Sequence, residues 1–339
     1  MFVMRVHLLA LCICVPAVIP ALAQDSPKSS AALCVMSFNI LQGGTEAKNV
    51  GFDNALFGGA RYDKLAAVIK LAQADVVGVQ EDCSGDELLK ALGNGWYRVG
   101  SVYARFEMTE LEVKPYLTVV EFQLTKEQRI RLVNCHWFPP AKGYGPELAQ
   151  AELRADPQLK DVATMTKRVA EKCAIPNGPR GYIATVKPLK AAIKAKVPVI
   201  LTGDFNEPSH LDWSDEYAKT GSDRWVKNPT GAPLRFAVRW PGSVTLADAG
   251  MIDSYRIIHS DPVKKPGNTW TPEYPERTPG RRAYGDQCLD RIDRIYHSGD
   301  SLEVCSAEVV GEKGEYADIV YADRWPSDHR GVVVTFRCD

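Results

Sequence analysis

Amide, carboxylate and imidazole side chains stand where the first apolar runs of this 339-residue chain end. Asn39 ends the first run, Glu81 the second and His136 a later one. Carboxylate and amide oxygens are the ligands that Mg²⁺ prefers, and imidazoles transfer protons or stabilise charge near neutral pH. Strands that end at one edge of a sheet would bring these three side chains together.

Three later motifs add acidic groups and a second histidine. The first motif follows an apolar run, the second begins one, and the third precedes the last apolar run of the chain. They contribute Asp204, Asn206, Asp293, Asp328 and His329. Hydrolysis of a phosphate ester needs a metal ion that neutralises oxygens, a group that activates water, and donors for the developing charge. Taken singly, each residue also fits a turn or a core position, so the argument depends on the complete set.

In this order the motifs resemble those of the endonuclease/exonuclease/phosphatase superfamily, whose members are similar to deoxyribonuclease I. The resemblance extends from residue 33 to residue 336. It rests on Asn39, Glu81, His136, Gly203-Asp204-Phe205-Asn206, Asp293 and Ser327-Asp328-His329. It implies an α/β fold, a four-layer α/β/β/α sandwich of two mostly antiparallel sheets. It also implies a phosphoric ester hydrolase that uses Mg²⁺, with Mn²⁺ and Ca²⁺ as alternatives.

The resemblance also implies a metal site. Glu81 corresponds to the main metal ligand, Asn39 to its hydrogen-bonded neighbour, and Asp328 to a residue beside the ion.

The remaining matches correspond to catalytic residues. His136 and His329 would bind the phosphoryl oxygens, and Asp293 would orient His329. Asp204 would help to activate water, with Asn206 orienting the water or the phosphate. The resemblance leaves the role of general base shared between Asp204 and His329.

The substrate is less well defined by the sequence. Leu41 stands where apurinic endonucleases carry an acidic residue, and the signatures of inositol polyphosphate 5-phosphatases are not matched. The formal net charge of −1 disfavours indiscriminate binding of polyanions, although a local basic groove would suffice for a nuclease. We expect an ester of a lipid headgroup, sugar or nucleotide. The alternatives are an extracellular nuclease acting on DNA or RNA and a catalytically silent exported binding protein.

Five further residues are candidates for substrate contacts. Trp137 and Tyr144 are aromatic residues near His136 that could stack on a base or sugar. His210 follows Asn206 by four residues. Arg281 and Arg282 lie in a proline-rich loop, residues 262–285, and their guanidinium groups could pair with phosphate.

The N-terminus has the pattern of a signal peptide. Residues 1–24 carry a single charge, Arg5, followed by an uncharged run that ends in Ala21-Leu22-Ala23. We therefore expect a secreted or periplasmic protein with a linker over residues 25–32 and a catalytic domain over residues 33–339. No later stretch reaches the roughly 18 apolar residues of a membrane helix. Seven cysteines follow the signal, and export predicts that some of them pair.

Elements that would position these groups can be read from hydrophobic periodicity. The expected strands cover residues 33–40, 74–81, 117–122, 130–136, 197–202, 292–296, 302–310 and 331–336. The expected helices cover residues 62–72, 159–173 and 185–195. No linker separates these elements, which favours one domain.

Overall fold

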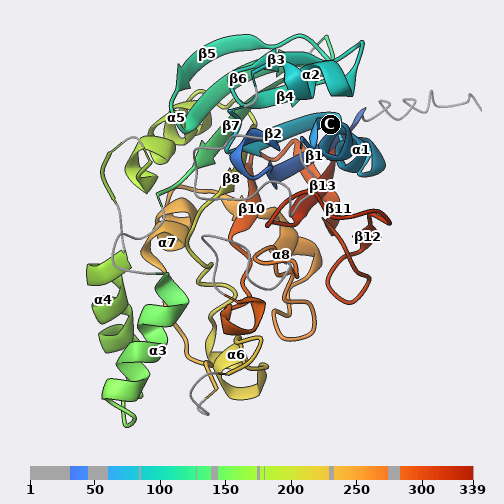
Figure 1. Ribbon diagram of the computed structural model, residues 1–339. Helices are drawn as coiled ribbons and strands as arrows, with labels where there is room; N and C mark the ends of the chain where they lie inside the picture. The colour runs from blue at the N-terminus through green and yellow to red at the C-terminus, as the bar shows by residue number, and fades with distance from the viewer. Residues whose placement is uncertain are drawn as a thin grey trace, which may run out of the picture. The chain divides into compact units, whose positions relative to one another are not determined.

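Two β-sheets packed face to face carry the fold (Figure 1). The computed structural model describes residues 31–44, 60–83, 85–126, 128–138, 144–173, 176–178, 180–228, 233–273 and 283–338. Residues 31–339 form one unit. The expected signal peptide and most of the expected linker lie outside the described residues. The first strand begins at Ala31 and therefore includes the last two residues of that linker.

The first sheet has the strand order β12-β11-β13-β1-β2-β4-β3. Its strands are β1 (Ala31–Asn39), β2 (Val76–Gln80), β3 (Tyr97–Val99), β4 (Val102–Ala104), β11 (Leu302–Gly311), β12 (Ile319–Val320) and β13 (Gly331–Cys338). Only the pairs β1–β2 and β11–β12 are parallel in this sheet. The pair β1–β13 joins the two ends of the described chain, with Ala31 opposite Cys338.

The second sheet has the strand order β5-β6-β7-β8-β10-β9. Its strands are β5 (Thr109–Lys114), β6 (Leu117–Gln123), β7 (Arg129–His136), β8 (Val199–Asp204), β9 (Ile252–Asp253) and β10 (Asp293–Ser298). Its one parallel pair is β7–β8. Both sheets are thus mostly antiparallel, as the resemblance implied.

The helices are α1 (Tyr62–Leu71), α2 (Glu87–Leu92), α3 (Gly145–Ala155), α4 (Val162–Cys173), α5 (Tyr182–Lys194), α6 (Asp215–Thr220), α7 (Pro241–Asp248) and α8 (Ser254–Ile258). Short 3₁₀ turns cover Gln42–Gly44 and Tyr284–Asp286. None of the helices in the described part of the chain is long and apolar enough to span a membrane.

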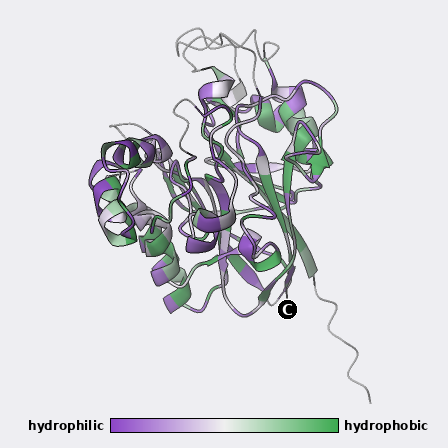
Figure 2. Ribbon diagram, turned by 90° about the horizontal axis from the view of Figure 1, so that it is seen from below, coloured by the Kyte–Doolittle hydropathy of each residue, from purple (hydrophilic) through white to green (hydrophobic). Residues whose placement is uncertain are grey.

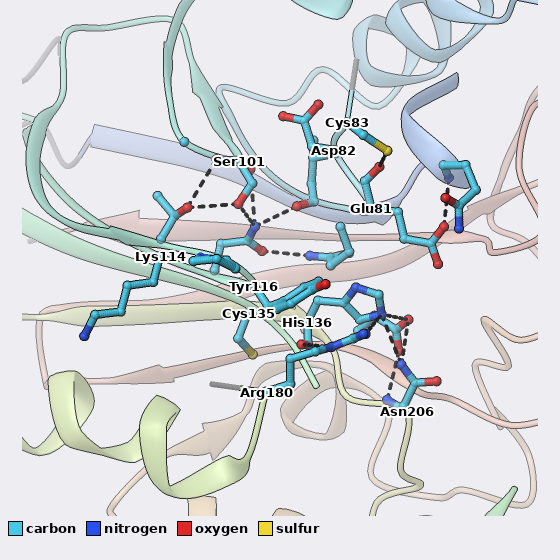
Figure 3. Close-up of a pocket in the computed structure, with 18 of the residues that line it drawn as sticks. Glu81, Asp82, Cys83, Ser101, Lys114, Tyr116, Cys135, His136, Arg180 and Asn206 are labelled. Atoms are coloured by element: carbon cyan, nitrogen blue, oxygen red, sulfur yellow. Dashed lines mark hydrogen bonds and ion pairs between the residues drawn. The ribbon is translucent and has the colours of Figure 1, made fainter. Parts of the chain in front are cut away.

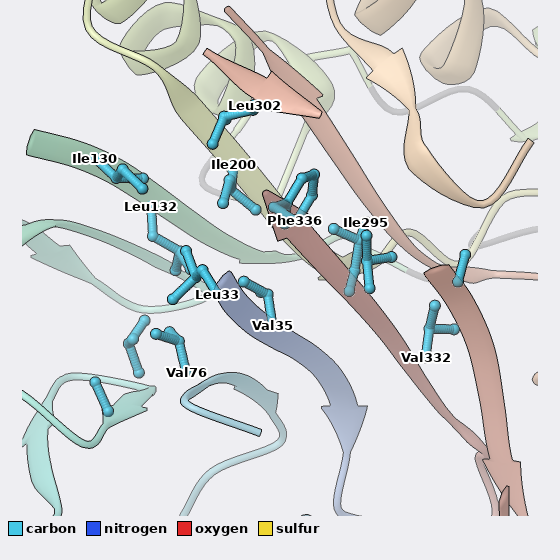
Figure 4. Close-up of a cluster of buried hydrophobic side chains, with 14 of the residues drawn as sticks. Leu33, Val35, Val76, Ile130, Leu132, Ile200, Ile295, Leu302, Val332 and Phe336 are labelled. Carbon is cyan, nitrogen blue, oxygen red and sulfur yellow. The ribbon is translucent and has the colours of Figure 1, made fainter. Parts of the chain in front are cut away.

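Side chains alternate between the two faces of the central strands, and this alternation produces four layers. On β1, Leu33 and Val35 face the second sheet, whereas Met36 and Phe38 pack under α1 and α2. The first set joins Leu132 and other side chains of the second sheet in the core between the sheets (Figure 4). On the outer face of the second sheet, strand residues pack against α5 and α7. The predicted α/β/β/α sandwich is confirmed, and its long central strands are coloured as hydrophobic in Figure 2.

The sheets approach each other closely beneath the edge where the polar residues gather. A Cβ atom added to Gly78 on β2 would lie 2.0 Å from Oγ1 of Thr202 on β8. Buried amides occupy the same region: Gln80 donates to Oδ1 of Asn134 at 2.7 Å, and Asn134 donates to the carbonyl of Val79 at 2.8 Å. Because these bonds cross between the sheets, they fix the position of one sheet relative to the other.

At least five of the seven cysteines that follow the expected signal peptide are free, and the expectation that some cysteines pair stays a prediction. The free thiols include Cys34, Cys83, Cys135, Cys288 and Cys305. Burial raises the pKa of Cys135 to about 12, so this thiol is unreactive and serves as a small core side chain.

Candidate active site

Strand register explains why distant polar residues meet. Asn39 lies opposite Gln80 in the parallel pair β1–β2, so Glu81 follows at the same edge. His136 lies opposite Asp204 in the parallel pair β7–β8, and Asp293 lies opposite the same Asp204 in the antiparallel pair β10–β8. Parallel strands end at a common edge, and an antiparallel neighbour begins there.

Asn39 links carboxylates from both sheets. It is fully buried, and its Nδ2 donates to Asp204 Oδ2 at 3.0 Å and to Glu81 Oε1 at 3.3 Å. Its Oδ1 accepts from the backbone N–H of Leu41 at 3.0 Å. One amide therefore holds Glu81 of the first sheet close to Asp204 of the second.

The backbone beside these carboxylates takes uncommon conformations. Glu81, Gln42 and Asn206 have φ values of 59°, 52° and 48°. Such left-handed conformations are strained for residues other than glycine and are concentrated at functional sites. The turn at Gln42 has a visible consequence, because its backbone N–H donates to Glu81 Oε2 at 2.8 Å. The Glu81 carboxylate is thus oriented from two directions.

Asp204, at the end of β8, contacts both Asn206 and His136. Its Oδ1 accepts from the backbone N–H of Asn206 at 2.9 Å, and its Oδ2 lies 3.3 Å from His136 Nε2. Burial by itself would raise the pKa of Asp204, but the imidazoles of His329 and His136 and the Asn206 N–H outweigh it and hold this pKa well below its usual range. Asp204 therefore remains ionised, although it is 1 % exposed.

His329 is held between carboxylates. Its Nδ1 is 2.9 Å from Asp293 Oδ2, its Nε2 is 3.9 Å from Asp204 Oδ2, and its ring lies 4.8 Å from that of Trp270. Burial would lower the pKa of His329, but Asp293 and Asp204 reverse that effect and raise it to about 10. Burial likewise raises the pKa of Asp293. His329 is therefore a cation at neutral pH.

These residues line a cavity of about 840 Å³ (Figure 3). At one end lie Glu81, His136, Asp204, Asn206, Asp328 and His329. From there the cavity extends past Tyr116 to Ser101 and Lys114, which belong to the β3–β4 turn and the β5–β6 hairpin. The expected metal-site and catalytic residues thus converge at one place: Asn39 and Asp293 are buried behind the cavity wall, and the other six line it.

The oxygen donors at this end suit a divalent cation. The carboxylates of Glu81 and Asp204 share one amide donor, and Asp328 lines the same cavity, so several negative charges meet in a buried place. Ligand atoms of Asp204, Asp293 and His329 also lie within 4.8 Å of one another. However, a protonated imidazole between two carboxylates has no lone pair to give a metal ion. The set formed by Glu81, Asp204 and Asp328 is the better fit.

Three expected substrate contacts, Trp137, Tyr144 and His210, are not among the described residues that line this cavity, and their roles stay predictions. Trp137 is 4 % exposed, packs 4.7 Å from the Phe205 ring, and donates through Nε1 to Thr185. Tyr144 packs against the hydrophobic cluster of α3 and α4. His210 is held by Ser243 Oγ, 2.9 Å from its Nδ1. Arg281 and Arg282 lie outside the described residues.

Two arginines at the site are not expected from the sequence. Arg180, which directly precedes Gly181 and α5, lines the cavity with its Nη2 2.9 Å from His136 Nε2. Arg61 is fully buried and donates to the carbonyls of Leu41 and Pro326, next to the two ends of the metal site. Neither stands in a motif, and each reaches the site only through tertiary packing, so the sequence carries no signal for them.

Comparison with known proteins agrees with this geometry. Residues 36–329 match the model of the "Endonuclease/Exonuclease/phosphatase family". An uncharacterised Caenorhabditis elegans protein is 30% identical over 147 residues, which are 41% of this chain and 41% of the relative. The chain thus spans less than half the length of that relative.

Two solved structures are similar to this chain at low sequence identity. The 3′ phosphatase NExo from Neisseria, solved with a product DNA hairpin, has a TM-score of 0.50 at 15% identity and covers 91% of this chain and 99% of its own. An endonuclease/exonuclease/phosphatase family protein from Bacteroides thetaiotaomicron has a TM-score of 0.49 at 15% identity, over 92% of this chain and 100% of its own.

Proposed function

We propose that this chain, which belongs to the endonuclease/exonuclease/phosphatase family, is an exported, Mg²⁺-dependent hydrolase acting on a small phosphate ester. One observation carries the proposal. Carboxylates and imidazoles from the facing ends of two sheets converge in one cavity, within hydrogen-bonding distance of one another.

The proposed roles follow from the contacts. Glu81, Asp204 and Asp328 would hold Mg²⁺, with Asn39 fixing the distance between Glu81 and Asp204. When bound, the ion would neutralise phosphoryl oxygens. Asp204 also stays ionised and can accept a hydrogen bond from the attacking water, which Asn206 helps to orient through its contact with Asp204.

The two histidines have different proposed tasks. His329 is a cation, so it would stabilise negative charge on the phosphoryl group and would not accept a proton from water. Asp293 keeps it charged and oriented through Nδ1. His136 presents Nε2 at the same place from the other sheet, beside Asn206 Nδ2 at 3.1 Å. In this proposal Asp204 accepts the proton of the attacking water.

Cavity size supports a small substrate. A volume of about 840 Å³ falls in the usual range for small-molecule sites, and its walls are formed by loops of both sheets. An ester of a lipid headgroup, sugar or nucleotide fits this better than a long duplex, which needs an extended basic surface. Nuclease action on DNA or RNA is the alternative that the substrate test decides.

Export is supported by the signal-like residues 1–24. N-terminal sequencing of protein recovered from the medium or periplasm should show cleavage just after Ala23 or Gln24. Recovery of only the uncleaved chain from the cytoplasm would contradict this part of the proposal.

The decisive experiment compares hydrolysis of bis-p-nitrophenyl phosphate, p-nitrophenyl phosphate, sphingomyelin, RNA and plasmid DNA by the same preparation. Each substrate is tested with Mg²⁺ and with EDTA. We expect Mg²⁺-dependent release from a small ester and little action on the plasmid. Preference for DNA or RNA would establish the nuclease, and no hydrolysis of any ester by a folded, Mg²⁺-loaded protein would refute the enzymatic proposal.

A further inference from the structure

One cation in the cavity is left without a carboxylate partner. Among the described residues that line it, Arg98 pairs with Asp82 and Asp86, and Lys114 pairs with Glu112. Both histidines lie within 4.0 Å of carboxylates. Arg180 makes no ion pair of this kind, although it lies beside the catalytic His136.

Arg180 is firmly held in place. Its Nε donates to the carbonyl of His136 at 3.2 Å, and its Nη2 donates to the carbonyl of Trp137 at 2.9 Å. Aromatic rings flank the guanidinium, with Tyr116 4.2 Å and Phe138 4.9 Å from its central carbon. Figure 3 shows Arg180 and Tyr116 beside His136. Such a clamp removes the rotamer freedom that an arginine would otherwise lose on binding a ligand.

The clamp is itself built by tight backbone turns. Tyr116 has a φ of 69°, and its carbonyl accepts from the backbone N–H of His136 at 3.0 Å. On the other side, the carbonyl of Arg180 accepts from the N–H of Phe138 at 3.0 Å. A Cβ atom on the next residue, Gly181, would lie 2.6 Å from the carbonyl oxygen of Asn177, so only glycine allows this turn. Both walls of the clamp are therefore tied to the strand end that carries His136.

The remaining donors suit an oxyanion. The hydrogen bonds to backbone carbonyls use Nε and Nη2 and do not involve Nη1, which can turn toward a ligand in the cavity; the Tyr116 side chain also interacts with the guanidinium. Partial burial also disfavours the charged form of Arg180 and lowers its pKa, so an anion that shares this place gains more than it would in water. Guanidinium groups are well matched to phosphate oxygens.

We propose that Arg180 is a substrate-binding residue of this hydrolase, and that it holds a non-bridging oxygen of the phosphate group next to His136. This inference rests on the proposed function and deepens it. Arg180 and Asp204 both lie beside Nε2 of His136, so both would be near a phosphate held there. The β5–β6 hairpin, through Tyr116, sets where that phosphate can lie.

The test measures binding of inorganic phosphate to the Mg²⁺-loaded protein by calorimetry, so it does not depend on turnover. Arg180→Met should weaken binding about 10- to 100-fold, the usual worth of a hydrogen bond to a charged group. Arg180→Lys keeps the positive charge but not the planar guanidinium group, and should recover part of the lost phosphate binding. Arg98→Met is the matched control, because Arg98 lines the same cavity but is already paired with Asp82 and Asp86.

Kinetics with the small ester separates binding from a merely structural role. Arg180→Met should raise KM together with the dissociation constant of phosphate, whereas a displaced His136 would mainly lower kcat. If Arg180→Met does not fold, Arg180→Lys against Arg98→Lys decides the question by the same phosphate measurement. Wild-type phosphate binding in the Arg180 variants, or equal weakening in the Arg98 variants, would overturn the inference. Absence of any turnover in the wild-type protein would instead refute the proposed function and leave the binding result standing.

Discussion

The charge on His329 can be tested directly by removing the charge of Asp293. Asp293→Asn keeps an oxygen that can accept a hydrogen bond from Nδ1, at the 2.9 Å distance seen here, but it removes the neighbouring negative charge. Two carboxylates, Asp293 and Asp204, raise the pKa of His329 against the effect of burial. With one of them neutral, this pKa should fall toward the ordinary value for histidine.

The size of the effect follows from the pKa. One pKa unit corresponds to about 1.4 kcal/mol, so the step from an ordinary 6.5 to about 10 corresponds to favourable interactions on the order of 5 kcal/mol. Asp293 is the larger contributor of the two carboxylates, and its loss should lower the pKa by roughly two units or more. His329 would then be mostly neutral at pH 8.5 in the variant and mostly charged in the wild-type protein.

Nitrogen-15 NMR of histidine-labelled protein in EDTA reports this charge. Of the six histidines in the chain, His329 should be the one that stays protonated at pH 8.5, and His329→Gln assigns its signal. Burial lowers the pKa of His210 and of His297, so neither should be mistaken for it. A neutral His329 at pH 8.5 in the wild-type protein, or an unchanged signal in Asp293→Asn, would refute the reasoning.

The stability of the folded protein should fall as the pH rises. The folded pKa of His329 lies above its unfolded value, so its stabilising contribution is complete below about pH 6.5 and is lost as the pH rises toward 10. Urea unfolding of the wild-type protein should therefore show falling stability between these values. In Asp293→Asn the part of this fall in stability that comes from His329 should be smaller.

Other consequences of the site can be measured with single variants. Glu81→Gln should abolish most Mg²⁺-dependent turnover of the small ester, because an amide replaces a charged ligand; wild-type turnover would show that the metal lies elsewhere. His136→Ala and His329→Ala should each lower kcat by roughly 100-fold or more, and the double variant should lose less than the product, since both act on one transition state; fully multiplicative losses would argue against a shared phosphoryl site. Burial raises the pKa of Glu207 to about 7, so its charged form destabilises the fold as the pH rises from about 4.5 through 7. Urea unfolding at pH 8 should then show Glu207→Gln to be more stable by up to about 3 kcal/mol, and equal or lower stability would contradict this.

Part of this site could be predicted from sequence because it depends on strand ends. An apolar run followed by a polar residue marks the edge of a sheet, and this pattern alone places Asn39, Glu81, His136 and Asp204 at one edge. All eight expected metal-site and catalytic residues do converge, although their roles remain predictions. Eight strands are likewise visible in the hydrophobic pattern. Short strands such as β3, β9 and β12 carry too few residues to show one, and β5 is too exposed to show one.

The residues whose positions differ from what the sequence suggests share a different cause. Trp137 and Tyr144 follow His136 in sequence, but sequence proximity does not say which face of a loop a ring occupies, and both rings are packed inside. Arg180 shows the reverse: it lies 44 residues from His136 along the chain, yet the two side chains touch. Side-chain direction in loops is decided by packing between distant segments, which local periodicity does not encode.

The place of β13 in the first sheet has a consequence for how the protein is made. This strand lies between β11 and β1, and it pairs with residues about 300 positions earlier in the chain. The first sheet therefore cannot close during synthesis until residues 331–338 have left the ribosome, and such distant pairings fold slowly. Asp328 and His329 directly precede that strand. Catalytic competence should thus arise in the last step of folding, and the gain of activity after dilution from denaturant would report insertion of β13 more faithfully than the gain of secondary structure.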